Sequence, residues 1–132
     1  MKTHLLLPAR FEMEDFNEIE KFIHDYAKQN SDGFTISIIL ENDSIILQKT
    51  TKGKVAAYAE TQDSFDLDGL KICLSHALKN GLTIGGWLDD TDNRFYFDSV
   101  KVFESELEAV SFGLQQNQIA IFDLDELKEI RL

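Results

Sequence analysis

The chain of 132 residues is poor in the residue types that mark secreted and membrane proteins. Its single cysteine, Cys73, cannot form an internal disulfide, so nothing indicates an oxidising compartment. Its start holds only three consecutive leucines before Pro8, which is too short for a signal peptide or a membrane span. We therefore expect a cytoplasmic protein that does not attach to a membrane.

Positive charge is also scarce, because 24 acidic residues stand against 13 lysines and arginines and the formal net charge is −11. Binding to nucleic-acid phosphates normally needs a basic surface, so direct nucleic-acid binding is disfavoured. The same reasoning disfavours binding to an anionic membrane. An acidic surface serves solubility or complements a basic partner. We expect a protein partner, for which a basic surface is one option, and the oligomeric state stays open.

Catalytic and cofactor-binding motifs are missing as well. The sequence has no G-x-S-x-G, G-x-G-x-x-G or G-K-[ST] motif, although a Ser–His–Asp triad outside such motifs stays open. Cys73 and His76 share a helix face and could form half a metal site or a nucleophile–base pair. Cysteine is more often a buried core residue, which we favour. We assign no catalytic residue, metal ligand or cofactor, and we favour a non-enzymatic protein.

The residues that are present predict one folded domain over 1–132. Hydrophobic residues make up 43% of the chain and ten of them are phenylalanine, which is enough for a core. Apolar periodicity predicts helices at 12–30, 67–80 and 105–116, and strands at 2–7, 34–41, 45–51, 54–60, 82–88, 94–100 and 118–124. The fold class is α+β, a mainly antiparallel sheet with about three helices in the order (β)-α-β-β-β-α-β-β-α-β.

Several details of this fold are predicted from single residues. Strands 34–60 are expected to form an antiparallel meander, and 118–124 a central strand, with one parallel pair allowed near the end. Asp66 and Ser105 are expected to cap helices, and Gly85-Gly86 to mark a bulge or a close approach of backbone. The third helix is expected to bury Leu107, Val110 and Leu114. The tail after 124 reads as a short helix or an edge strand.

The stretch between the strands at 82–88 and 94–100 holds the candidate binding residues. Its acidic loop, 89–93, consists of ordinary turn formers, with a loose Ca²⁺ or Mg²⁺ site as the alternative. Strand alternation places Phe95 and Phe97 in the core and leaves Tyr96 on the other side, where Trp87 would join it as an anchor for a partner. Partial burial is expected to raise the pKa of Asp98. The candidate binding residues are Trp87, Asp89, Asp90, Asp92, Tyr96 and Asp98.

The pattern GGWLDDTDNRFYFDSVKVF…EAVSFGLQQNQIAIFDL resembles a C-terminal module of uncharacterised proteins from bacteriophages and bacterial mobile elements. In that module a G-W strand, a turn, a Y/F-x-D strand, a helix and a Q-x-A-x-F/Y-D-L strand follow in order. The matching residues are Gly86, Trp87, Tyr96, Asp98, Gln118, Ala120, Phe122 and Asp123. The resemblance covers roughly the last third of the chain. It implies a phage or mobile-element accessory protein and carries over no catalytic residue.

Three functions are compatible with these features. The first, which we favour, is a protein-binding accessory, immunity or inhibitor factor, because the chain is small, acidic and without a catalytic motif. The second is a DNA mimic that inhibits a nucleic-acid-binding protein, since acids recur at 12–20, 89–98 and 123–129. The third is a small metal-dependent hydrolase that uses Asp89, Asp92 and Asp98.

Overall fold

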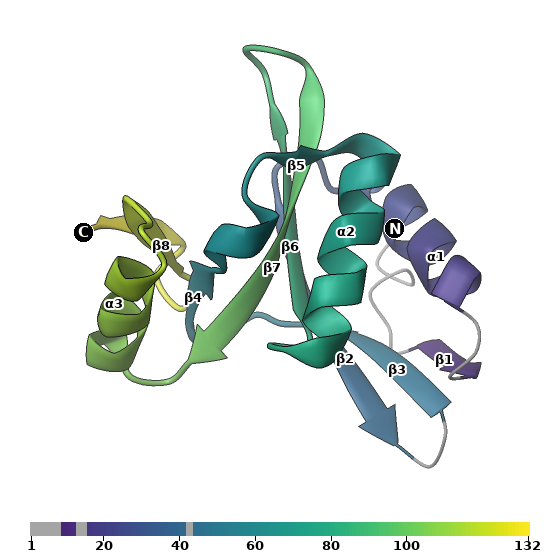
Figure 1. The fold of residues 1–132 in the computed structure, drawn as a ribbon, viewed down its shortest axis with the longest axis horizontal. Coiled ribbons are helices and arrows are strands. Elements are labelled where there is room, and N and C mark those ends of the chain that lie inside the picture. Colours follow the sequence, from purple (N-terminus) through teal and green to yellow (C-terminus); the bar gives the residue numbers. More distant parts are fainter. Residues whose placement is uncertain (1–8, 13–15, 42–43) are drawn as a thin grey trace.

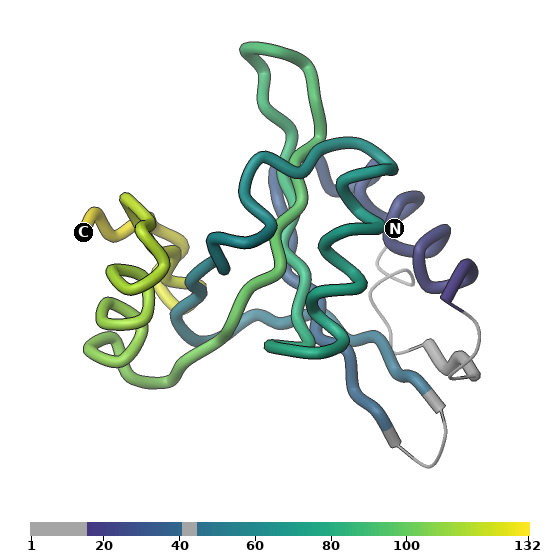
Figure 2. Tube along the Cα trace, viewed as in Figure 1, coloured from purple at the N-terminus to yellow at the C-terminus, as the bar shows by residue number. Residues whose placement is uncertain are grey.

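A computed structural model gives the fold of the chain and describes residues 9–12, 16–41 and 44–132 (Figures 1 and 2). The helices are α1 (Phe16–Gln29), α2 (Asp66–Lys79) and α3 (Glu106–Gln115), with a 3-10 turn, η2, at Ala59–Thr61. The strands are β1 (Ala9–Glu12), β2 (Phe34–Glu41), β3 (Ser44–Lys49), β4 (Lys54–Ala57), β5 (Ser64–Phe65), β6 (Thr83–Asp89), β7 (Arg94–Phe103), β8 (Ala120–Asp123) and β9 (Lys128–Arg131).

The described strands form one antiparallel sheet in the order β1-β3-β2-β6-β7-β4-β8-β9. The ten residues of β7 join the two halves of this sheet. The first half of β7 pairs with β6 and β5, and its second half pairs with β4. The predicted fold class, an antiparallel α+β arrangement with three helices, is therefore confirmed.

The larger hydrophobic core, called the first core below, lies between the sheet and helices α1 and α2 (Figure 1). Its residues recur every three or four positions in the helices and every second position in β2, as the sequence predicts. Cys73 is one of them, so its predicted place in the core is confirmed. The buried side chains are Ile19, Ile23, Tyr26, Ala27, Phe34, Ile36, Ile38, Ile45, Leu47, Leu70, Cys73, Leu74, Ala77, Ile84 and Phe97.

A second core lies under α3 and is much smaller. Its buried side chains are Ala56, Ala109 and Ile121, and the partly buried Phe103, Val110, Phe112 and Ile130 pack against them. Tyr58 connects the two regions, since its ring contacts His76 of α2 at 4.8 Å and Phe112 of α3 at 5.1 Å between ring centroids. The three helices therefore lie on one side of the sheet, and the other side is called the open face.

Two strand predictions are wrong. β4 does not extend a meander from β3, because β1 and β2 occupy both edges of β3 and β4 pairs with β7 and β8 instead. The parallel pair allowed near the end does not form among the described strands, since β4 separates β7 from β8. The predicted central strand is only next to the sheet edge, and the side chain of Phe122 is exposed. The tail forms the edge strand β9, one of its two predicted alternatives, and the predicted strand at 2–7 lies outside the described residues.

The prediction for the buried face of α3 is correct only for Val110, which packs against the second core. Ala109 and Gly113 face the sheet, whereas Leu107 and Leu114 are 79% and 57% exposed. Small residues face the sheet because α3 lies close to the strands. A Cβ added to Gly113 would be only 2.9 Å from Ile121 Cγ2. The predicted cap at Ser105 is confirmed, since its hydroxyl accepts the Glu108 N–H at 3.2 Å.

The expectations for Asp66 and for Gly85-Gly86 are corrected. Helix α2 is preceded by Phe65 and has no side-chain cap, and Asp66 is its first residue with a φ of 60°. The Gly85-Gly86 pair forms no bulge, because β6 pairs with β2 and β7 in unbroken register. The alternative expectation, a close approach, is met by a side chain. The ring of Phe34 would lie 2.6 Å from a Cβ added to Gly86, so only glycine leaves room for it.

Candidate functional site

The β6–β7 hairpin extends beyond the rest of the molecule, at the top of Figure 1. Its strands pair in register from Ile84↔Ser99 to Asp89↔Arg94, and the turn between them closes with a backbone hydrogen bond from Asn93 to Asp89 at 2.7 Å. Asn93 has a φ of 59°, a conformation that asparagine tolerates better than most residues. The acidic loop therefore works as a tight turn that holds two strand ends away from the body of the protein.

Flat side chains form a row across the open face of this hairpin. The Trp87 and Tyr96 rings stack, with centroids 5.3 Å apart and an interplanar angle of 18°. Tyr96 also meets the edge of Phe65, its cross-strand partner in β5, at 5.6 Å. The Arg94 guanidinium lies 4.2 Å from the centroid of the Phe65 ring. We call these four residues the aromatic ladder.

The ladder lies on the open face because its neighbours point the other way. Phe97 is buried in the first core and Phe95 packs against it, and both alternate with Tyr96 along β7. The sequence prediction for Phe97 and Tyr96 is therefore confirmed. Trp87 is 43% exposed, an unusual position for so large an apolar ring.

Two carboxylates of the turn are held in place beside the ladder. Asp92 Oδ2 accepts the Tyr96 hydroxyl at 2.6 Å, and this hydrogen bond raises the pKa of Tyr96. Asp89 Oδ1 accepts both the backbone N–H and the hydroxyl of Thr91, at 2.8 and 2.6 Å, and these bonds lower the pKa of Asp89. Both carboxylates are therefore fixed acceptors, while the neighbouring Asp90 is exposed.

Asp98 lies on the same open face, two residues after Tyr96 and opposite Gly85. Burial, helped by the negative charge of Asp63, raises the pKa of Asp98 to about 6. Within the described part of the chain, no hydrogen bond or ion pair satisfies this carboxylate. The ionised form of Asp98 is therefore destabilised unless a hydrogen-bond donor or a cation binds to it. The direction of this pKa shift is the one predicted from the sequence.

The structure brings all six predicted binding residues to one hairpin, and it adds two that sequence reasoning missed. Phe65 and Arg94 complete the ladder, and Phe65 comes from a segment some thirty positions earlier in the chain. No local sequence pattern indicates the β5–β7 pairing that brings Phe65 there. Across the described residues, no group of three His, Cys, Asp or Glu side chains is arranged to hold a metal ion.

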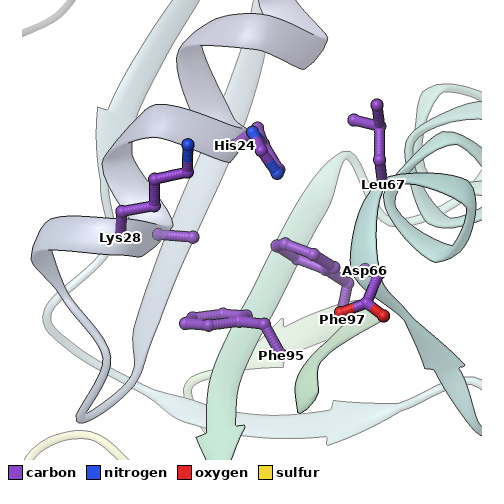
Figure 3. A pocket seen from close by; sticks show the side chains of 7 residues that line it. His24, Lys28, Asp66, Leu67, Phe95 and Phe97 are labelled. Atoms are coloured by element: carbon purple, nitrogen blue, oxygen red, sulfur yellow. The ribbon is translucent and has the colours of Figure 1, made fainter. Parts of the chain in front are cut away.

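A separate hollow of about 310 Å³ lies on the helix side of the sheet, between α1 and α2 (Figure 3). Phe95 and Phe97 form its floor, while His24 and Lys28 line the α1 side. Asp66 lines the α2 side, which places a carboxylate across from the two basic residues. The volume is at the lower end for small-molecule sites. Because Phe95 and Phe97 alternate with Tyr96, the hollow is separated from the aromatic ladder by the sheet.

A Ser–His–Glu cluster occurs near the junction of the two cores. His76 Nε2 lies 2.7 Å from Glu60 Oε1, and His76 Nδ1 lies 2.8 Å from Ser99 Oγ. A nucleophilic serine must reach a substrate, but Ser99 is 0% exposed and sits in β7 beneath α2. Burial also raises the pKa of the nearby Cys73 to about 11, which suppresses its thiolate. The cluster therefore joins α2 to the sheet and offers no nucleophile.

Comparisons with known proteins add no relative to these observations: no family model, no curated protein and no solved structure matches the chain. The helices in the described ranges are also all too short or too polar to cross a membrane.

Proposed function

We propose that the protein is a binding factor whose aromatic ladder, with the acids beside it, captures a basic segment of a partner protein. The observation that supports this most is the half-exposed Trp87, stacked on Tyr96 where the projecting hairpin leaves the body of the protein. Exposed and ordered aromatic rings are common centres of protein interfaces. An accessory, immunity or inhibitor role for a phage or mobile element is a natural setting for such a factor.

The chemistry of the hairpin favours arginine in the partner. Arginine stacks on aromatic faces and pairs with carboxylates in the same geometry, which lysine does less well. Asp89, Asp90 and Asp98 lie around the ladder and supply the carboxylates. The overall charge of −11 also attracts a basic partner over longer distances.

The two alternative functions have less structural support. A DNA mimic needs an accessible row of carboxylates, yet Glu20 and Asp123 are buried. The described acids of the first run in α1 are also far from the hairpin and from β8–β9 in Figure 1. A metal-dependent hydrolase needs free carboxylates around one point. Asp89 and Asp92 are instead engaged by Thr91 and Tyr96.

Because Trp87 is the single tryptophan, its fluorescence reports directly on the ladder. Titration with a short arginine-rich peptide should give a saturable change in emission, a lysine-rich peptide a weaker one, and a glutamate-rich peptide none. Affinity for the arginine-rich peptide should rise from pH 5 to pH 8 as Asp98 loses its proton. Equal responses to all three peptides, or no saturable response, would refute the proposal.

Charge variants separate the hairpin from the general acidity of the protein. Asp90→Lys should weaken peptide binding strongly, whereas Glu104→Lys, which makes the same charge change at an exposed site before α3, should leave it nearly unchanged. Asp98→Asn should remove the rise in affinity between pH 5 and pH 8. Similar losses in the Asp90 and Glu104 variants would show that only net charge attracts the peptide.

A further inference from the structure

The free end of the sheet at β9 carries charges of alternating sign. β9 is last in the sheet order and, among the described residues, pairs with β8 alone. Glu129 and Arg131 lie on the open face beside Phe122 and Ala120 of β8, while Ile130 packs against the second core. An unpaired strand edge is a template for pairing with another strand.

One hydrogen bond shows which backbone groups of β9 face outward. The Leu132 N–H donates to the carbonyl oxygen of Ile119, on the β8 side, at 2.9 Å. The N–H and C=O groups of successive residues in a strand point to alternate sides. The backbone groups of Glu129 and Arg131 therefore point away from β8 and are available to a further strand.

Charge selects one way for two copies of this edge to pair. Two copies of β9 related by a two-fold axis can pair antiparallel through these outward backbone groups in three registers. The axis then passes through Glu129, Ile130 or Arg131. The first and third place a charged residue opposite its own copy, which is destabilising. The register centred on Ile130 places each Glu129 opposite Arg131 of the second copy. The Arg131–Glu129 ion pair at 3.6 Å already shows that these side chains reach one another on one face.

Exposed apolar side chains also occur near the end of β9 and in the adjoining helix α3. A Cβ on Gly113 would lie 2.8 Å from Leu132 Cδ1, so α3 sits against the end of β9. Leu114, the next residue of α3, is 57% exposed, and Ile119, whose carbonyl binds Leu132, is 71% exposed. These exposed apolar side chains add apolar surface to the C-terminal region beside the charged edge.

We propose that the protein forms a two-fold symmetric homodimer in which β9 pairs antiparallel with β9 of a second copy, centred on Ile130. The two Ile130 side chains meet at a non-hydrogen-bonded position, where side chains are closest. The two Glu129–Arg131 pairs fix the register. The hairpin with the aromatic ladder lies elsewhere in the molecule (Figure 1), so this dimer is independent of the proposed binding function.

Analytical ultracentrifugation of charge-reversal variants tests the dimer. Measurements at about 0.15 M salt limit the repulsion between two acidic copies, because the Debye length is then about 8 Å. The natural protein should show a monomer–dimer equilibrium. Glu129→Arg and Arg131→Glu should each weaken self-association by about tenfold or more, since each places like charges opposite each other twice. Both side chains are exposed, so folding should be unaffected.

Mixing the two variants gives the sharpest result. In an equimolar mixture, the two arginines of E129R face the two glutamates of R131E, so a heterodimer should form with at least the natural affinity. The double variant E129R/R131E should again self-associate. A matched mixture of Glu104→Arg and Lys49→Glu, with the same changes of net charge at other exposed sites, should show no such preference.

Three outcomes would overturn the proposal. The first is a natural protein that stays monomeric at about 1 mM, because its free energy of dimerisation would then be weaker than roughly 4 kcal/mol. The single variants could associate as well as the natural protein. The mixture of E129R and R131E could fail to recover the dimer while circular dichroism shows both variants folded.

Discussion

The two cores of this protein differ in how completely they bury apolar side chains. The first core contains fifteen buried residues from two helices and four strands, whereas the second contains three. Six of the ten exposed large hydrophobic residues in the described chain are at positions 107–132, the part that surrounds the second core. The first core therefore stabilises the fold, and the second region leaves apolar surface for contacts with other molecules.

The reason for this difference is the number of layers around each core. α1 and α2 both cover the first core, and the aromatic rings of Phe34 and Phe97 fill the space beneath them. α3 covers the second core alone and contributes mainly Ala109 and Gly113, which bring it close to the sheet but add little apolar area. A single short helix cannot cover all the leucines around it. The two regions should therefore respond differently to the same kind of change.

The largest difference is expected for equivalent core truncations. Leu74→Ala should lower the free energy of unfolding by about 4 kcal/mol, and Ile121→Ala by about 2 kcal/mol, because a cavity near the surface relaxes more easily. Leu74 is 0% exposed in the first core, and Ile121 is 3% exposed in the second. Urea unfolding curves measure both values. A larger loss for Ile121→Ala would contradict the assignment of the first core as the main source of stability.

The pH dependence of stability should have opposite signs at two aspartates. The folded-state pKa of Asp98 is about 6 against 3.8 when unfolded, so the folded state binds the proton more tightly and stability falls as pH rises through this range. Asp98→Asn should therefore stabilise the protein by about 2 kcal/mol at pH 8 and by little at pH 4.

Asp125, near the second core, is the matched control. A hydrogen bond from Lys54 lowers the pKa of Asp125, so its stabilising effect is present above pH 3.8 and is lost as pH falls through the folded-state pKa. Asp125→Asn should therefore destabilise the protein at pH 8, and the difference should disappear in acid. Urea unfolding of the Asp98 variant at pH 4 and pH 8, and of the Asp125 variant at about pH 2 and pH 8, checks the two signs. Equal signs at pH 8 would contradict these assignments.

Two buried helical glycines should differ when alanine replaces them. Alanine favours a helix by about 1 kcal/mol at either position. At Gly69 the new Cβ would lie 2.5 Å from the backbone carbon of Ser64, whereas at Gly113 it would meet only the side-chain ends of Leu132 and Ile121. Gly69→Ala should cost about 2 kcal/mol, and Gly113→Ala less than about 1 kcal/mol. Thermal unfolding measures both, and similar losses would show that α3 is as tightly held as α2.

The smallest expected effect is a difference in local opening. Hydrogen exchange in the native protein should be about tenfold faster for the amides of α3 than for those of α2, because fewer buried contacts hold α3. Mass spectrometry of peptides covering each helix measures this ratio. Equal protection in the two helices would show that the second core opens only when the whole protein unfolds.

Much of the fold was predictable because local periodicity determines it. The apolar spacing of Ile19, Ile23 and Tyr26 identifies α1, and the cap at Ser105 fixes the start of α3. The alternation around Tyr96 identifies which rings enter the core. The candidate site was predictable in part for the same reason, because Trp87 and Tyr96 flank a short turn and become cross-strand partners in any hairpin of this register.

The remaining features depend on pairings between distant segments. Phe65 joins the aromatic ladder only because β5 pairs with β7, and β4 leaves β3 only because β1 occupies its edge. Leu107 and Leu114 fit a helical stripe as well as Ala109 and Gly113 do. The close approach of α3 to Ile121 selects the small residues, and no pattern within the helix contains that information.

The sequence by itself determined the acidic charge, the fold class, the identity of most elements and the inward or outward direction of the hairpin rings. These properties follow from composition and from periods of two and about 3.6 residues, which act over a few neighbours. Only the tertiary structure decided the sheet order, the buried face of α3 and the charge-alternating free edge at β9. Those choices depend on which distant surfaces fit together in space, and spacing along the chain does not encode that fit locally.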